Sequence, residues 1–155
     1  VPFYLWAAFG LGLGRADVGG APLSSTEYGE ALPAAIVVAL GKITSGIFGT
    51  PEPWVEHVRR VADRAGDRVW PMPIHEEYFE QLKSEIADFT NTGGRPAGAI
   101  TAALFLKEFT GGLPWVHLDI AGTALGSPQT DINKSWSSGW GVRLLNELVQ
   151  EHYER

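Results

Sequence analysis

Apolar residues recur along this chain with two periods, one typical of helices and one typical of strands. The clearest helical period has apolar residues at positions i, i+4, i+7 and i+11. These residues are Trp54, Val58, Val61 and Ala65. Pro53 precedes the run and Gly66 follows it, and these residue types commonly start and end helices. The pattern therefore predicts an amphipathic helix between Pro53 and Gly66.

Three further segments have weaker helical periods, at residues 76–87, from about Ala97, and from about Gly141. Each is predicted to be a helix with one buried face. The residues expected to face the core are Phe79, Leu82, Ile86, Ile100, Ala103, Leu104, Phe109, Val142, Leu145, Leu148 and Val149. A short apolar run at residues 34–40, which ends at Gly41, fits either a buried helix or a strand.

Two segments are predicted to be strands. Residues 43–48 form a short apolar run, and residues 115–120 alternate between apolar and polar positions. In the alternating segment His117 and Asp119 share one side of the strand, and the three aliphatic residues share the other. Helices that alternate with short strands indicate an α/β fold, with helices packed on a sheet.

The first 33 residues show neither period. Residues 1–14 are rich in aromatic residues and glycine, and residues 15–30 are small, polar and turn-prone. No regular element is predicted there. We therefore divide the chain into a divergent N-terminal segment, residues 1–33, and a regular part, residues 34–155. Because the chain begins with valine, we expect a fragment or a processed product.

Composition and charge narrow the classes of function. The 155 residues are 45% hydrophobic and 19% charged, which is typical of a globular protein. A net charge of −6 without a Lys/Arg cluster argues against a nucleic-acid partner. The absence of cysteine excludes disulfides and thiolate metal sites. The N-terminal apolar run is too short to span a bilayer, so we expect no membrane association and a cytoplasmic location.

Two motifs and six shorter pieces stand in order between residues 34 and 149. The motifs are NTGGRPAGAITA at 91–102 and WVHLDIAG at 115–122. The shorter pieces are AIVVALG at 35–41, GIFG at 46–49, WPMP at 70–73, HEEY at 75–78, FLKEF at 105–109 and GWGVRLL at 139–145. Taken together, the set resembles the C-terminal part of the leucyl (cytosol) aminopeptidases of peptidase family M17.

The resemblance implies a partial mixed-sheet aminopeptidase catalytic domain of the α/β class, in a family whose members usually assemble as hexamers. These enzymes are metallopeptidases, hydrolases that remove N-terminal residues from peptides with two divalent metals, Zn, Mn or Mg. The metals polarise the scissile carbonyl and lower the pKa of a bridging water, so that hydroxide attacks near neutral pH. The implied partners are therefore a peptide substrate and further copies of the chain, as a homo-oligomer.

The residues that would hold these metals are missing from the sequence. The family supplies them from an upstream Lys/Asp segment and from an Asn-Thr-Asp-Ala-Glu-Gly-Arg motif. None of the six Asp of this chain is followed two places later by Glu. The family spacing puts the motif at residues 2–8, which read PFYLWAA. We therefore expect no catalytic residue, no metal ligand and no retained cofactor, and an inactive isolated chain.

A second departure lies just before Ala34. The Thr-Leu-Thr-Gly that lines the family's substrate site aligns with residues 31–34, which read ALPA and keep only Leu32. Our hypothesis is that residues 1–33 are a foreign or out-of-frame segment joined to a genuine aminopeptidase tail.

Three residues are carried over from the family as candidate substrate-binding residues. Ala121 and Ala124 follow the strand motif, at positions that in the family help to wall the pocket for the substrate's N-terminal side chain. Their small size would leave room for a group the size of leucine. The alternative, that they are small only for packing, has equal weight. Leu32 is the weakest of the three, because its neighbours differ from the family's.

Other polar motifs are interpreted as structural. His117 and Asp119 share one face of a strand and could be a ligand pair, but the family does not use them as ligands, so we expect a polar pair satisfied by hydrogen bonds inside the sheet. HEEYF at 75–79 begins like the zincin motif His-Glu-x-x-His but ends in Phe, so it is expected to open a helix with acids at its positive end. The glycines of residues 91–95 indicate a tight loop rather than a phosphate site.

Three hypotheses for function stay open. The first is an aminopeptidase segment that has lost its chemistry. The second is a non-catalytic oligomerising or partner-binding module derived from that family. The third is an orphan fragment that leaves apolar surface uncovered.

Overall fold

The computed structural model describes residues 4–8, 35–90, 93–94, 96–124, 131, 134–135 and 137–154. Four strands form one sheet in the order β1-β4-β2-β3. They are β1 (Tyr4–Ala8), β2 (Ser45–Thr50), β3 (Val69–Pro71) and β4 (Trp115–Asp119). β1 runs parallel to β4, β4 antiparallel to β2, and β2 parallel to β3. The sheet is therefore mixed, and the predicted α/β class is confirmed.

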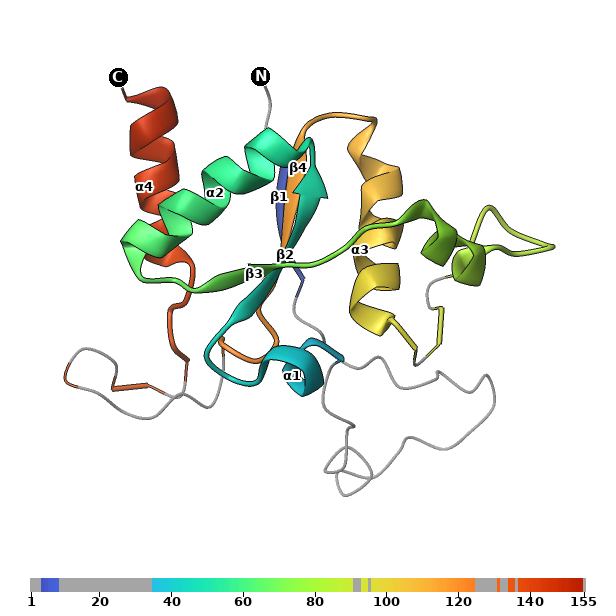
Figure 1. Ribbon diagram of the computed structural model, residues 1–155, viewed down its shortest axis with the longest axis horizontal. Coiled ribbons are helices and arrows are strands. Elements are labelled where there is room, and N and C mark those ends of the chain that lie inside the picture. The colour runs from blue at the N-terminus through green and yellow to red at the C-terminus, as the bar shows by residue number, and fades with distance from the viewer. Residues whose placement is uncertain are drawn as a thin grey trace.

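Helices cover both faces of this sheet (Figure 1). On one face lie α2 (Glu52–Ala65) and α4 (Val142–Tyr153). On the other lie α1 (Ala35–Leu40), the 3-10 helix η1 (Glu76–Leu82), and α3 (Gly98–Lys107), which continues into the 3-10 helix η2 (Glu108–Thr110). Each face has its own core. The first is built around Ile47, Val58, Leu118 and Leu144, and the second around Ile36, Phe48, Leu104 and Trp115.

Helix α2 has the end and the buried face that the sequence predicts, but it begins at Glu52, so Pro53 lies in its first turn and not before it. Val58, Val61 and Ala65 are buried against the sheet. Gly66 ends the helix in the left-handed conformation, with φ of 78°, which glycine adopts without a Cβ penalty. The stop residue therefore acts as predicted.

Three of the other helical predictions are wrong in part. The helix expected over residues 76–87 is a 3-10 helix that ends at Leu82, and Ile86 is 97% exposed. The Ser84 hydroxyl accepts hydrogen bonds from the backbone N–H groups of Ile86 and Ala87. This local turn competes with the helix, which explains the early end.

The buried face predicted for α3 is confirmed at Ile100, Ala103 and Leu104, which are all buried. The prediction is wrong at one residue of the segment that follows. Phe109 was expected in the core, but it lies in η2 and is 61% exposed. In α4, Val142 and Val149 are exposed and the fully buried residue is Leu144, because the contacts with α2 select another part of the apolar stripe.

The strand predictions also need correction at their ends. β2 begins at Ser45, and Ile43 is exposed instead of paired. The ambiguous run at residues 34–40 is the helix α1. No element was predicted among the first 33 residues, yet Tyr4–Ala8 is a strand. Its only described pairing is with β4, more than 100 positions away, and a local pattern does not reveal such a contact.

Strand β4 confirms the alternation predicted for residues 115–120. Its aliphatic side chains enter the core beneath α2 and α4. Its other side faces the second core, where the His117 ring lies 5.6 Å from the ring of Phe48. Residues 115–118 are all buried, as is typical of a strand with neighbours on both edges and helices on both faces.

The loop before α3 uses its two described glycines in different ways, one for a left-handed backbone and one for a close contact. Gly94 has φ of 90°, and a Cβ on Gly93 would lie 2.9 Å from the Cγ2 atom of Thr101. Both facts fit the predicted tight loop, although Asn91, Thr92 and Arg95 lie outside the described residues. Among the residues that the structure describes, no helix is long and apolar enough to cross a membrane.

Candidate functional site

Two of the three candidate substrate-binding residues, Ala121 and Ala124, lie in the turn that follows β4. The Ile120 carbonyl accepts hydrogen bonds from the N–H groups of Thr123, at 3.1 Å, and Ala124, at 3.0 Å. These bonds fold residues 120–124 into a compact turn at the end of a central strand.

Hydroxyl groups that the sequence analysis did not single out hold this turn. The hydroxyls of Ser45 on β2 and Thr123 are 2.6 Å apart, and both residues are buried. The Ser138 hydroxyl donates to the Thr123 carbonyl at 2.6 Å, and the Ser138 N–H donates to the Ala124 carbonyl at 3.0 Å. Serine and threonine are common in loops, so no sequence period indicated this network.

Ala121 and Ala124 lie on opposite sides of the sheet. Ala121 is half-buried and packs against the core that contains α1 and α3. Ala124 is 7% exposed and belongs to the core beneath α2 and α4. The third candidate, Leu32, lies outside the described residues.

Helix α1 packs directly on the same turn. A Cβ on Gly122 would lie 2.2 Å from the carbonyl oxygen of Gly41, which follows α1. It would also lie 3.5 Å from the Cγ2 atom of Val37 within the helix. The two backbones touch, so the position of α1 fixes the position of Ala121 and its neighbours.

Asp119 is the carboxylate at the end of β4, next to the turn. Its Oδ1 atom accepts a hydrogen bond from the Ala121 N–H at 3.2 Å. Burial raises the pKa of Asp119, and this effect outweighs the Ala121 hydrogen bond and the nearby His117, which both lower the pKa. The hydrogen bond gives Asp119 a structural partner, as expected for a polar group in the sheet.

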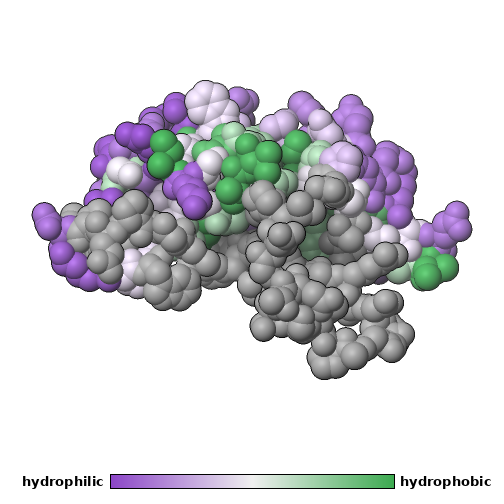
Figure 2. All heavy atoms as spheres, turned by 90° about the horizontal axis from the view of Figure 1, so that it is seen from below, coloured by the Kyte–Doolittle hydropathy of each residue, from purple (hydrophilic) through white to green (hydrophobic). Residues whose placement is uncertain are grey.

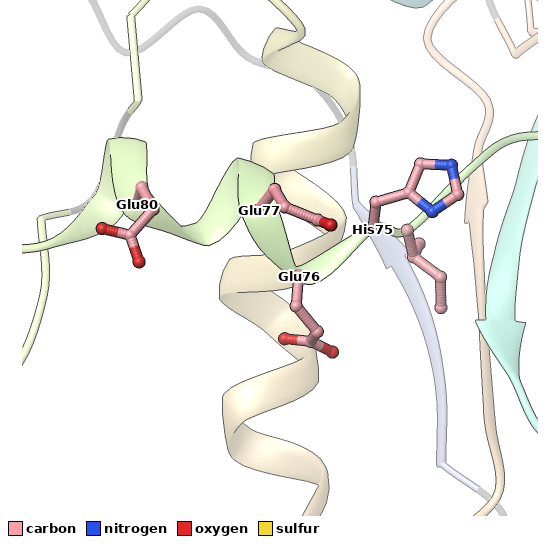
Figure 3. A pocket seen from close by; sticks show the side chains of 5 residues that line it. His75, Glu76, Glu77 and Glu80 are labelled. Atoms are coloured by element: carbon pink, nitrogen blue, oxygen red, sulfur yellow. The ribbon is translucent and has the colours of Figure 1, made fainter.

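A separate open pocket of about 600 Å³ lies at the start of η1. It is lined by Ile74, His75, Glu76, Glu77 and Glu80. Figure 3 shows that the labelled side chains point in different directions rather than toward one point.

Two of the three acids of this pocket form ion pairs. Glu76 pairs with Lys107 in the last turn of α3, and Glu80 pairs with Lys83 at 2.6 Å. Glu76 and Glu77 stand in the first turn of η1, as predicted for acids at the positive end of a helix.

The described residues do not fit a two-metal centre. Among them there is no group of three or more His, Asp or Glu side chains that could hold a metal ion. Asp119, with His117 nearby, already accepts a backbone hydrogen bond from Ala121. A pair of divalent ions needs several converging oxygen or nitrogen ligands, and the described residues supply no such set.

Comparison with known proteins identifies the family of this chain. The model of the cytosol aminopeptidase family, catalytic domain, matches residues 30–146. A probable cytosol aminopeptidase from Xanthobacter autotrophicus is 54% identical over 123 residues, which cover 79% of this chain and 25% of the relative. Similar proteins from Rhodopseudomonas palustris and Agrobacterium fabrum are 52% and 50% identical over the same length.

A solved structure agrees with these matches. A mutant of tomato leucine aminopeptidase superposes with a TM-score of 0.68 at 40% identity, over 76% of this chain and 23% of that chain. The chain therefore belongs to the cytosol aminopeptidase family, as its motifs predict. It spans about a quarter of the length of the relatives that it matches.

Proposed function

We propose that this chain is a segment of a leucyl aminopeptidase catalytic domain that keeps part of the peptide-binding wall and lacks the groups for metal-dependent hydrolysis. The observation that carries the proposal is the turn after β4, which is held by the Ser45–Thr123 hydrogen bond and by the contact of Gly122 with Gly41. A wall for a substrate side chain must be rigid, and these contacts fix the turn from two sides.

Within this wall we assign different tasks to the two alanines. Ala121, which is half-buried beside α1, contributes the surface next to the substrate's N-terminal side chain. Ala124 packs in the opposite core and sets the position of the turn from behind. Leu32 is proposed to extend the wall from the residues just before α1.

The missing chemistry is supported by the sequence. No Asp is followed two places later by Glu, and residues 2–8 contain no carboxylate. The isolated chain is therefore proposed to be inactive, and residues 1–33 to be a divergent segment ahead of the aminopeptidase part at 34–155. By the same family resemblance we propose a cytoplasmic location and self-association as a homo-oligomer.

Hydrolysis of leucine p-nitroanilide tests the proposed inactivity. The pure chain is assayed with Zn, Mn or Mg ions, and the Xanthobacter autotrophicus relative serves as the positive control. We expect no release of nitroaniline by this chain. Metal-dependent turnover that remains with the protein through purification would contradict the proposal.

Methyl NMR tests the proposed wall separately. The chain is labelled on its alanine methyl groups and titrated with leucine amide. We expect the Ala121 resonance to shift and that of Ala62, which is fully buried in α2, to stay in place. Equal shifts, or no shift at either methyl, would argue that Ala121 is small only for packing.

The alternative function, a non-catalytic partner-binding module, is favoured by large apolar side chains that the fold leaves exposed. In the described part of the chain these are Val38, Ile43, Trp70, Ile86, Phe109, Val142 and Val149. Light scattering on the pure chain separates the two functions. A defined oligomer without binding of leucine amide would favour the module.

A further inference from the structure

Four phenylalanines from three separate segments pack together beside α3. They are Phe79, Phe89, Phe105 and Phe109, and we call them the phenylalanine cluster. The ring of Phe89 meets each of the other three edge-on, and the ring centroids of Phe105 and Phe109 are 5.2 Å apart. Three members are half-buried against the core, whereas Phe109 is 61% exposed. The inner rings therefore hold a large aromatic ring in place at the surface.

Acidic side chains stand next to this cluster. Three of the four phenylalanines have an exposed acid as a direct neighbour in the sequence. These acids are Glu80, Asp88 and Glu108. Consecutive Cα atoms are about 3.8 Å apart, so a group bound at the rings also reaches the neighbouring carboxylates.

The charge balance of this surface is strongly negative. Residues 74–90 and 96–110 contain six acids and two lysines. Both lysines already pair with acids of η1. Asp88 and Glu108 form no ion pair within the part of the chain that the structure describes. Figure 2 shows hydrophilic side chains gathered over the end of the molecule that holds η1. A ligand for this surface must therefore carry positive charge.

Arginine is the side chain whose chemistry matches both the ring and the carboxylates. Its planar guanidinium stacks on aromatic faces and binds a carboxylate through two parallel hydrogen bonds. A lysine ammonium supplies the charge, but it has no flat face and no fork of donors. A second copy of this chain, joined through the same face, would place acids against acids, which disfavours that occupant.

We propose that the phenylalanine cluster and its acids bind an arginine-bearing segment of a partner protein. One guanidinium stacks on the exposed ring of Phe109 and pairs with Glu108, and a second arginine of the segment pairs with Asp88. This surface lies at the start of β4, which η2 precedes, whereas the candidate peptide wall lies at the end of β4. The proposal goes beyond the proposed function and can fail independently of it.

NMR titration of the full 155-residue chain tests the proposal. The probe is the peptide acetyl-Arg-Leu-Arg-Leu-Arg-Leu-amide, and two matched peptides carry lysine or glutamate in place of every arginine. We expect amide shifts in residues 85–89 and in η2, and an affinity for the arginine peptide about two- to fivefold above that for the lysine peptide. The glutamate peptide should not bind, and added salt should weaken the binding of both cationic peptides.

Two variants separate the role of the ring from that of the charges. Phe109→Leu keeps an apolar side chain and should remove the preference for arginine over lysine. The double variant with Asp88→Asn and Glu108→Gln should weaken both cationic peptides about fivefold. Glu52→Gln, at an exposed acid in the first turn of α2, is the matched control and should leave both affinities unchanged. All four positions are exposed, so the melting temperature should stay the same in each variant.

The three peptides on the unchanged chain decide the matter even if a variant folds poorly. Equal affinities for the arginine and lysine peptides would overturn the proposal. Shifts confined to the turn after β4 would overturn it as well and would assign peptide binding to the candidate wall. Dimerisation of the chain that Phe109→Leu abolishes would assign the surface to a second copy instead.

Discussion

Asp67 is expected to anchor helix α4, and its replacement is the sharpest test of how this fold is held together. The residue is 4% exposed and lies in the turn between α2 and β3. Its Oδ2 atom accepts a hydrogen bond from the N–H of Leu144, in the first turn of α4, at 3.2 Å. Gly141 at the N-cap of α4 has no side chain that could make this bond. Asp67 therefore caps α4 from another part of the chain.

The magnitude follows from this geometry. Loss of a helix cap costs about 0.5–2 kcal/mol, and a buried N–H left without an acceptor costs about 1–3 kcal/mol. Leu144 is fully buried, so water does not easily replace the carboxylate. We expect Asp67→Ala to lower the free energy of unfolding by about 2 kcal/mol, which for a chain of this size shifts Tm by roughly 4–8 °C.

Urea denaturation followed by circular dichroism measures the effect. The matched control is Asp63→Ala in α2, where an exposed carboxylate lies 3.6 Å from Arg59. A surface pair of this kind contributes about 0–1 kcal/mol. If Asp67→Ala and Asp63→Ala destabilise the chain equally, or if Asp67→Ala has no effect, the assignment of Asp67 as the cap of α4 is wrong.

Three further predictions concern the turn after β4 and the contact between α2 and α4. Gly122→Ala should destabilise the chain by about 1–3 kcal/mol in urea melts, because its Cβ would collide with the Gly41 carbonyl. Ser45→Ala should cost about 1–3 kcal/mol by leaving the buried Thr123 hydroxyl short of a partner, and the double variant with Thr123→Val should cost less than the sum of both single changes. Desolvation lowers the pKa of His57 below its ordinary value of 6.5, so the folded chain favours the neutral imidazole. The stability that neutral His57 contributes is complete above pH 6.5 and is lost as the pH falls below the lowered pKa. His57→Phe should make the unfolding free energy less dependent on pH below 6.5.

Matched measurements control these three predictions. Gly98→Ala adds a methyl group at an ordinary 3.6 Å contact with the Cβ of Ala35, and it should cost far less than Gly122→Ala. Additive effects of the Ser45 and Thr123 changes would show that their hydroxyls do not interact. Glu151, Arg60, Arg64 and His152 also act on His57, so the comparison is made at constant ionic strength. The same pH slope with and without His57 would contradict its assigned role.

The sequence predicted those elements whose chemistry is local. Helix α2 has a regular apolar period and ends at a glycine, so both its end and its buried face followed from neighbouring residues. Strand β4 alternates strictly, and its two faces were assigned correctly. In both segments the residues that the apolar period assigns to one face are the residues that pack in the core.

The errors arise where a contact that a helical period does not encode decides which residues are buried or where a helix ends. In α4 the apolar stripe is broad, and contact with α2 buries Leu144 instead of Val142. After Leu82, the Ser84 hydroxyl and the bond from the Thr90 N–H to the Leu82 carbonyl form a turn in place of the helix. The spacing of apolar residues along the chain does not indicate either contact.

The candidate site also has a part that could be located from the sequence and a part that could not. The family motifs located the turn at Ala121 and Ala124, but this information came from resemblance and not from the physics of the residues. The hydroxyls of Ser45, Thr123 and Ser138 come from three separate segments of the chain. Only the folded sheet brings these segments together, so their hydrogen bonds could not be predicted from spacing.

Strand β1 joins residues outside the matched family segment to the sheet. Tyr4–Ala8 lies outside residues 30–146, which match the family, yet all five of its residues pair in register with β4. Strand pairing uses backbone groups that every residue except proline carries in full, so it does not require common ancestry. The start of the segment that the family model matches therefore lies between two neighbouring strands of one sheet. A cut made at that boundary would remove a hydrogen-bonded neighbour of the central strand rather than a detachable tail.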